Sequence, residues 1–476
     1  MTEDKTRNKP KPMIENMRRN MRRVFWVFFL LFLLAAGYLV KLAVFDAREI
    51  ASNSYNYRLR AENNDRHPGM ILDWKGRVLA ESVDGGNGGF TREYPYGRIF
   101  AHVVGTRRTR TGLEAKYNFD LQQLDSELMQ RIDELTSGKP LVGNTIVTTF
   151  DAALQKAAYE ALAGRKGAVV AIEPSTGRVL AMVSAPDFPL DASSEDWDAL
   201  VAADENSPLL NRAAQGLYAP GSTFKIITAA AALEQGKGDF TMTCTGSAAF
   251  GEYTMRCFDS KAHGEVNLDK AMAQSCNVYF ATLGQELGAA ALRDMAERFG
   301  FNRPTNFPLE SKPSAFAMTD GARVDEVIET SIGQGKTLAA PLQMAMTAAT
   351  VANGGLMMRP YVLDSIQTRD LKVLEKAMPK SFERIVSQEV AARLNELMVN
   401  VISAGTGSAA QIPGVTVAGK TGTAQNETGR DHSWFVGYAP AEYPEIVVAV
   451  ILEETGGGTE ATRLGGKVMR AWLERE

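Results

Sequence analysis

Residues 220–227 read Pro-Gly-Ser-Thr-Phe-Lys-Ile-Ile, and the run continues as Thr-Ala-Ala-Ala-Ala-Leu-Glu-Gln to Gln235. The helix that this pattern predicts over 222–235 is apolar on every side, so it should lie at the centre of its domain. Ser222 and Lys225 share one face of its first turn, where unpaired N–H groups favour a developing anion. A lysine deprived of solvent loses its charge and can accept a hydroxyl proton. An isolated S-x-x-K pattern, however, is more often a helix cap and a surface lysine.

Two further motifs follow in the chain and give this pair a context. Ser275-Cys276-Asn277 lies within a second predicted helix, and Lys420-Thr421-Gly422-Thr423 lies within a predicted strand. Each motif is weak alone. The order S-x-x-K, S-x-N, K-T-G is the signature of penicillin-binding proteins and serine β-lactamases. Together the three motifs predict a serine acyl-transfer site.

Turn residues and apolar runs predict one antiparallel sheet with a large helical insertion. Residues 168–173 and 178–183 are strand-like and are joined by a Pro-Ser-Thr-Gly turn, which is typical of a hairpin. Three more strands, joined by short links, are expected at 415–424, 433–438 and 445–452. Helices are expected at 222–235, 268–287, 341–352 and 388–402. The predicted fold class is therefore α+β, with a five-stranded antiparallel sheet flanked by helices.

The N-terminal segment predicts attachment to a membrane. Residues 24–45 carry one charged side chain, Lys41, and a helix of about 20 residues spans a bilayer. Residues 1–23 hold eight basic and three acidic side chains, so we expect this tail in the cytoplasm and the rest of the chain outside. The apolar run is long and lacks a clean cleavage site, which favours a single-pass anchor in the cell membrane over a signal peptide.

Length and charge limit the remaining choices. The chain has 476 residues and a formal net charge of −4, which predicts more than one domain and no nucleic-acid partner. After the basic tail (1–23) and the anchor (24–45), we expect a small non-catalytic domain at 46–147, called here the pedestal. A catalytic domain is expected at 148–476.

The cysteines indicate neither a disulfide framework nor a metal. Cys244, Cys257 and Cys276 are the only ones, and no CxxC pair or H-E-x-x-H motif occurs, so no metal site and no cofactor are predicted. Cys244 and Cys257 flank a turn-rich loop and can pair in an oxidising compartment, which would leave Cys276 unpaired. Free thiols are the alternative, because sequence spacing does not fix the distance between two Cα atoms.

Longer stretches around the three motifs resemble the transpeptidase domain of class B, monofunctional penicillin-binding proteins. These stretches are Glu173–Val183, Gly216–Lys225, His263–Val266, Gly333–Gly335, Pro341–Gln343 and Trp434–Gly437. Pro68–Ala80 and Thr111–Glu114 resemble the pedestal of the same class, and the chain is most like the penicillin-binding protein A branch. It departs from the common pattern at Trp74, Lys75, Cys276 and Ala340, none of which is a catalytic position.

The resemblance implies a peptidoglycan D,D-transpeptidase that cross-links stem peptides and is acylated by β-lactams. Ser222 would attack the carbonyl between two terminal D-alanines, and Lys225 would take its proton. Ser275 would relay that proton to the leaving D-alanine. The N–H groups of Ser222 and Thr423 would form the oxyanion hole.

The resemblance also implies how the substrate is held. Asn277 would bind the donor peptide backbone and Lys225, and Lys420 would supply positive potential beside Ser275. Thr421 and Thr423 would bind the terminal carboxylate, and Gly422 would leave room for the substrate.

Other functions remain open at this stage. A D,D-carboxypeptidase or a serine β-lactamase would use the same motifs, and a non-catalytic β-lactam sensor or scaffold would retain them. Residues 414–421 also match the phosphate-binding pattern G-x-x-x-x-G-K-[ST], but strand formers surround the lysine where a P-loop would open a helix. The pedestal is too short for a glycosyltransferase, so we expect a polytopic glycan-strand polymerase as partner. The role in division, elongation or sporulation stays open.

Overall fold

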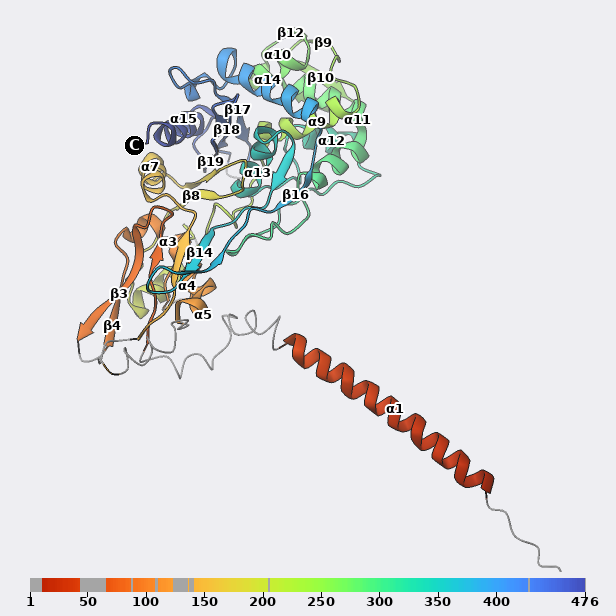
Figure 1. Ribbon diagram of the computed structural model, residues 1–476. Helices are drawn as coiled ribbons and strands as arrows, with labels where there is room; N and C mark the ends of the chain where they lie inside the picture. Colours follow the sequence, from red (N-terminus) through yellow and green to blue (C-terminus); the bar gives the residue numbers. More distant parts are fainter. Residues whose placement is uncertain are drawn as a thin grey trace, which may run out of the picture. The chain divides into compact units, whose positions relative to one another are not determined.

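The computed structural model describes residues 11–42, 66–86, 89–107, 110–122, 136, 141–203, 206–426 and 429–475. The chain forms two compact units, Met1–Asn63 and Asn64–Glu476. The first contains helix α1 (Lys11–Lys41; Figure 1). Its segment Asn16–Lys41 contains an 18-residue stretch with a mean hydropathy of 2.2 that is not buried in the protein, so it is long and apolar enough to cross a membrane. Residues 43–45 of the predicted anchor lie outside the described residues.

The second unit contains the predicted five-stranded sheet. The strand order is β17 (Ala418–Ala424), β18 (His432–Ala439), β19 (Ile446–Leu452), β7 (Gly167–Ile172) and β8 (Val179–Ala185). All neighbours pair antiparallel. The predicted strands are confirmed, with ends that move by a few residues. Strand β17, which carries the K-T-G motif, lies at one edge of this sheet.

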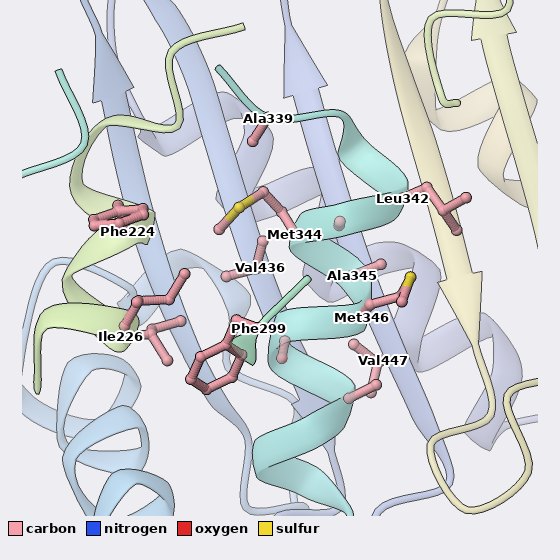
Figure 2. Packing of buried hydrophobic residues seen from close by; sticks show 14 of the residues in the cluster. Phe224, Ile226, Phe299, Ala339, Leu342, Met344, Ala345, Met346, Val436 and Val447 are labelled. Atoms are coloured by element: carbon pink, nitrogen blue, oxygen red, sulfur yellow. The ribbon is translucent and has the colours of Figure 1, made fainter. Parts of the chain in front are cut away.

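Both faces of the sheet are covered, because its strands are apolar on both sides. Helices α7 (Ala152–Leu162) and α15 (Thr459–Leu473) pack on one face, where Phe435 belongs to their cluster. Helix α13 (Pro341–Ala352) packs on the other face, where the next residue, Val436, points. Figure 2 shows α13 in front of the strands, with Phe224 beside it. The sheet is therefore a rigid central layer.

The helical insertion brings the other two motifs to this layer. The 3-10 turn η4 (Gly221–Phe224) runs directly into α9 (Lys225–Glu234), and every residue from Phe224 to Ala232 is buried, as the sequence predicts. The single helix predicted over 268–287 is wrong. The chain forms α10 (Leu268–Ala273) and α11 (Asn277–Arg298), because Ser275 between them has a φ of +54°.

A second sheet, of six strands, contains the strands of the pedestal. Its strand order is β15 (Val373–Lys376), β14 (Leu363–Gln367), β6 (Thr145–Thr148), β2 (Ile71–Leu72), β3 (Val78–Gly86) and β4 (Gly89–Glu93). Two of these strands come from residues 363–376. Ile366 on β14 pairs with Ile146 on β6, so the chain returns to complete the pedestal after building most of the catalytic domain (Figure 1).

The remaining elements are mostly short, apart from α14 (Gln388–Ala404), which packs against β17. They are β1 (Arg66–His67), η3 (Gly97–Phe100), α3 (Ala101–Val104), α4 (Gly112–Lys116), α5 (Asn118–Gln122), β5 (Leu141–Val142), α8 (Ser194–Ala202), β9 (Met242–Cys244), β10 (Ser247–Phe250), β11 (Tyr253–Arg256), η5 (Phe258–Ser260), β12 (Gly264–Val266), α12 (Val324–Ser331), β13 (Leu356–Met358), β16 (Ser381–Arg384), α14 (Gln388–Ala404) and η6 (Ser408–Ala410).

Candidate active site

Hydrogen bonds join the three sequence motifs into one site. Lys225 Nζ, at the start of α9, donates to Ser275 O at 2.8 Å and to Asn277 Oδ1 at 2.7 Å. It also lies 3.2 Å from Ser275 Oγ. Lys420 Nζ, on β17, donates to the same Ser275 Oγ at 3.0 Å. Residues separated by up to 195 positions in the chain therefore meet around one serine hydroxyl.

Lys225 lies at the centre of the site. Its side chain is fully buried, and this loss of solvent lowers its pKa from 10.5 to about 7. A neutral amine has two N–H groups and one lone pair. The bonds to Ser275 O and Asn277 Oδ1 use both N–H groups, so the lone pair faces the third neighbour, the Ser275 hydroxyl, and can accept a proton there.

Ser275 lies between the two lysines. Its positive φ ends α10 and turns its side chain toward the Nζ atoms of both lysines. Lys420 is fully buried as well, and its pKa lies well below the usual lysine value because of burial and the nearby charge of Lys225. The Ser275 hydroxyl is thus placed to pass a proton between two lysines whose pKa values are both lowered by burial.

Ser222 lies on η4 and is partly exposed, whereas Lys225, three residues later, is buried. Gly221 fixes this turn against the edge strand: its φ is +52°, and a Cβ there would lie 2.4 Å from Thr423 O. Gly221 N also donates to Gly333 O at 2.9 Å. Only a glycine permits so close an approach at a positive φ, and the serine is thereby held beside β17.

The K-T-G strand presents two threonines on one side, because side chains alternate along a strand. Thr421 Oγ1 is 2.7 Å from Thr406 Oγ1, a contact that the sequence analysis missed. Gln334 Nε2 donates to Thr423 O at 3.5 Å. The segment 333–335 had been noted for its resemblance to the family, but no pattern in the chain predicts either contact with β17.

Gly422 has a reason to be glycine other than the one expected. A Cβ at this position would lie 2.8 Å from Trp434 Cβ and 2.9 Å from Thr223 Cγ2. The absence of a side chain therefore lets η4 pack directly against β17. The P-loop pattern at 414–421 is a coincidence, because the chain continues as a strand after Lys420, whereas a P-loop opens a helix.

The three cysteines lie together beside the S-x-N motif. They are buried free thiols, with 3.7 Å between the Sγ atoms of Cys244 and Cys257. A Cys244–Cys257 disulfide thus stays a prediction. Cys276 Sγ, which that disulfide would leave unpaired, lies 3.6 Å from Cys257 Sγ, and Cys244 Sγ lies 3.5 Å from His263 Nδ1. These four residues could hold a metal ion, a grouping that the sequence analysis did not foresee.

The fold and the site define a serine acyl-transfer protein, and the chain belongs to the penicillin-binding protein transpeptidase family. The family model of the penicillin-binding protein transpeptidase domain matches residues 167–473. Residues 68–146 match the penicillin-binding protein A dimerisation domain, within the segment that we call the pedestal. The predicted resemblance to class B members is confirmed.

Full-length relatives are similar over nearly the whole chain. The peptidoglycan D,D-transpeptidase PbpA of Mycolicibacterium smegmatis is 35% identical over 94% of this chain and 96% of its own length. Penicillin-binding protein A from M. tuberculosis has been solved as acyl-enzyme complexes with ceftriaxone and with imipenem. Both structures align with 87% of this chain and with 100% of their own chains, each with a TM-score of 0.80. The sequence identities are 34% for the ceftriaxone complex and 35% for the imipenem complex.

Proposed function

We propose that this protein is a peptidoglycan D,D-transpeptidase that works through an acyl-enzyme on Ser222. The observation that carries the proposal is the fully buried Lys225, which is hydrogen-bonded to the S-x-N motif and whose lowered pKa, about 7, lets its neutral form accept the serine proton. The similarity to D,D-transpeptidases and to β-lactam acyl-enzymes supports the same reaction.

In the acylation half-reaction, Ser222 Oγ attacks the carbonyl carbon of the penultimate D-alanine. Lys225 takes the hydroxyl proton, and the C–N bond to the terminal D-alanine breaks. Ser275, hydrogen-bonded to both lysines, delivers a proton to the departing amine. In the second half-reaction, an amine of a neighbouring stem attacks the ester, and Ser222 regains its proton.

The oxyanion of each tetrahedral intermediate would be bound by the N–H groups of Ser222 and Thr423. The carbonyl of Thr423 faces Gly221 and Gln334, away from the neighbouring strand β18. In an antiparallel strand the N–H and C=O of one residue point to the same edge. The Thr423 N–H is therefore directed to the free edge of β17, next to η4, which supports its role as a donor.

Substrate binding would use the charge and hydroxyls of β17. Thr421 and Thr423 bind the terminal carboxylate, and Lys420 supplies the positive potential that a carboxylate requires in a buried site. Asn277 has its Oδ1 occupied by Lys225, whereas its Nδ2 donates to Arg256 O at 3.1 Å. We expect that amide group to turn toward the donor peptide when substrate binds.

The proposed reaction is tested with the purified full-length chain in detergent. A stem pentapeptide ending in D-Ala-D-Ala is the donor, and a labelled D-amino acid is the acceptor. We expect D-alanine release together with incorporation of the label, and neither product with Ser222→Ala. Release without incorporation would assign a D,D-carboxypeptidase instead, and absence of both would leave a sensor or scaffold.

We also propose that α1 is a single-pass anchor with a cytoplasmic N-terminus. The excess of basic residues before the apolar segment supports this orientation. Protease added to intact spheroplasts should then digest residues 64–476 and spare an N-terminal tag. Digestion of the tag alone would reverse the orientation, and release of a soluble chain would indicate a signal peptide.

A glycan-strand polymerase is the proposed partner, because the reaction needs polymerised strands to cross-link. Replacing residues 24–45 with an unrelated membrane helix should abolish co-purification with a polytopic polymerase. Unchanged co-purification would move the contact to another part of the chain or remove it from the proposal.

A further inference from the structure

We propose that Cys244, Cys257, His263 and Cys276 form a structural zinc site. The site lies next to the catalytic S-x-N motif, because Cys276 is the central residue of that motif. Their four ligand atoms all lie within 4.8 Å of one another. The zinc ion would be additional to the groups that carry out the proposed reaction.

The distances between ligand atoms are those of a tetrahedral zinc site. Zinc–sulfur bonds of about 2.3 Å place two thiolate sulfurs about 3.8 Å apart, and a zinc–nitrogen bond of about 2.0 Å gives a sulfur–nitrogen distance of about 3.5 Å. The corresponding distances here are 3.7 Å for Cys244–Cys257, 3.6 Å for Cys257–Cys276 and 3.5 Å for Cys244 Sγ–His263 Nδ1. Three edges of the tetrahedron are thus already present.

Local backbone structure brings the four residues of the site together from separate turns and strands. Strand β12 pairs antiparallel with β9 so that Gly264 lies opposite Cys244, which brings His263 to the same end. The β10–β11 hairpin returns the chain, and Cys257 N donates to Gly246 O at 2.9 Å. This arrangement holds three of the four residues without the fourth, Cys276.

The surroundings suit thiolate ligands and exclude solvent from three of them. Cys244 and Cys276 are fully buried, and Cys257 is 4% exposed. At the N-terminus of the 22-residue helix α11, Tyr279 N donates to Cys276 Sγ at 3.4 Å, and Val278 N hydrogen-bonds to Cys257. Backbone N–H donors to ligand sulfurs are the outer-shell contacts that metal–thiolate sites use.

The ligand set selects the metal and its role. Three thiolates and one imidazole are a tetrahedral zinc set, whereas magnesium and calcium prefer oxygen ligands. Four protein ligands leave no open position, so the metal is structural. On binding, Zn²⁺ displaces the three thiol protons, which are released to solvent, and no redox change is involved.

The site would position the catalytic loop, a consequence that rests on the proposed function. Cys276 lies between Ser275 and Asn277, both of which contact Lys225. A ligand bond at Cys276 would fix the positive-φ turn that presents them. The cysteine and the histidine are therefore positioning residues and do not touch the substrate.

The site is tested on the full-length chain, reduced in detergent, incubated with excess Zn²⁺ and dialysed. We expect about one zinc per chain by mass spectrometry. Co²⁺ in its place should give sulfur-to-metal charge-transfer absorption and the d–d spectrum of a tetrahedral ion. Cys257→Ser and His263→Asn should lose the metal, whereas Lys261→Ala, on the same exposed loop, should keep it. Circular dichroism reports whether each variant is folded. If Cys257→Ser does not fold, His263→Asn, the milder change, tests the site.

Removal of zinc from the wild-type chain by a chelator should slow penicillin acylation by about ten- to a hundredfold, and Zn²⁺ but not Mg²⁺ should restore it. Ser222→Ala should bind zinc normally, so failure of the metal site and failure of the nucleophile are separate results. The proposal is overturned by a chain that binds no zinc, by a folded Cys257→Ser variant that retains it, or by an octahedral cobalt spectrum. In the protein as isolated from the membrane, two of the cysteines could react with an alkylating reagent only after reduction. That result would show a disulfide in place of the zinc site.

Discussion

At the residue scale, the site depends on a lysine that is buried and yet hydrogen-bonded. An unpaired buried polar group costs several kcal/mol, about 2 to 7 in a typical case, whereas Lys225 has three polar neighbours. The surrounding residues therefore stabilise a neutral amine on the residue three positions after Ser222. Which residues form the site could be predicted from the sequence, because S-x-x-K, S-x-N and K-T-G occur in the required order.

Substitution of Lys225 should remove acylation and leave the fold intact. We expect Lys225→Met to lower the second-order rate constant for penicillin acylation by about 10²- to 10⁴-fold, since the general base is lost. Lys156→Met changes an exposed lysine on α7 and should acylate at the wild-type rate. Stopped-flow measurement with a fluorescent penicillin compares the two variants. Equal rates for Lys225→Met and wild type would assign the base elsewhere.

The acylation rate should rise with pH. Burial lowers the pKa of Lys225 to about 7, and only the neutral amine above that pKa accepts the serine proton. We expect a sigmoidal increase of the rate constant with a midpoint near pH 7 and a plateau above about pH 8. A midpoint near the ordinary lysine value of 10.5 would show that Lys225 is charged in the free enzyme.

At the element scale, strand positions were easier to predict than helix ends. The strands are continuous apolar runs between turn residues, so β7, β8, β17, β18 and β19 lie close to their predicted positions. The break between α10 and α11 was not predicted, because Ser275 adopts a positive φ that its residue type does not require. Helix α15 was not predicted either. Its Gly465 and Gly466 weaken the helical pattern, but they allow close contact with Phe435 and Ala410.

The packing of η4 against β17 predicts an effect of Gly422→Ala. Its new Cβ would meet Trp434 and Thr223, so we expect a loss of about 1 to 3 kcal/mol in stability and slower acylation. Gly321→Ala adds a Cβ with nothing within 4 Å and should behave like wild type. Thermal melting and acylation rates report the two effects. A Gly422→Ala protein as stable and as fast as Gly321→Ala would contradict the close packing.

A buried ion pair ties the end of β19 to the segment that precedes η4. Arg212 Nε lies 2.7 Å from Glu453 Oε1, and their side chains are 2% and 11% exposed. Glu453→Ala would leave the buried guanidinium without its counter-charge, so we expect a loss of about 3 to 5 kcal/mol in the free energy of unfolding. Glu460→Ala breaks a pair whose carboxylate is 47% exposed and should cost at most about 1 kcal/mol. Denaturant titration in detergent should separate the two variants clearly. Equal losses would show that the Arg212–Glu453 pair is not a stabilising contact.

At the scale of the whole molecule, the order of parts was predictable but one of their connections was not. The apolar N-terminal segment and the catalytic motifs can be recognised from short stretches of the sequence. The sharing of the pedestal sheet by residues 363–376 depends on a long-range pairing of Ile366 with Ile146, which no local pattern encodes. The same holds for the cysteine–histidine cluster, whose members are 6 to 32 residues apart and meet only through the β9–β12 and β10–β11 pairings.

The central claim is that Ser222 is the acylated nucleophile. The most direct measurement is intact-mass analysis and peptide mapping of the full-length chain after incubation with a penicillin, beside Ser222→Ala as the control. The account predicts one long-lived adduct on the peptide that contains Ser222, absent from the variant. Rapid hydrolysis of the adduct would indicate a β-lactamase. No adduct on the folded wild-type chain at any concentration would contradict the assignment of the nucleophile.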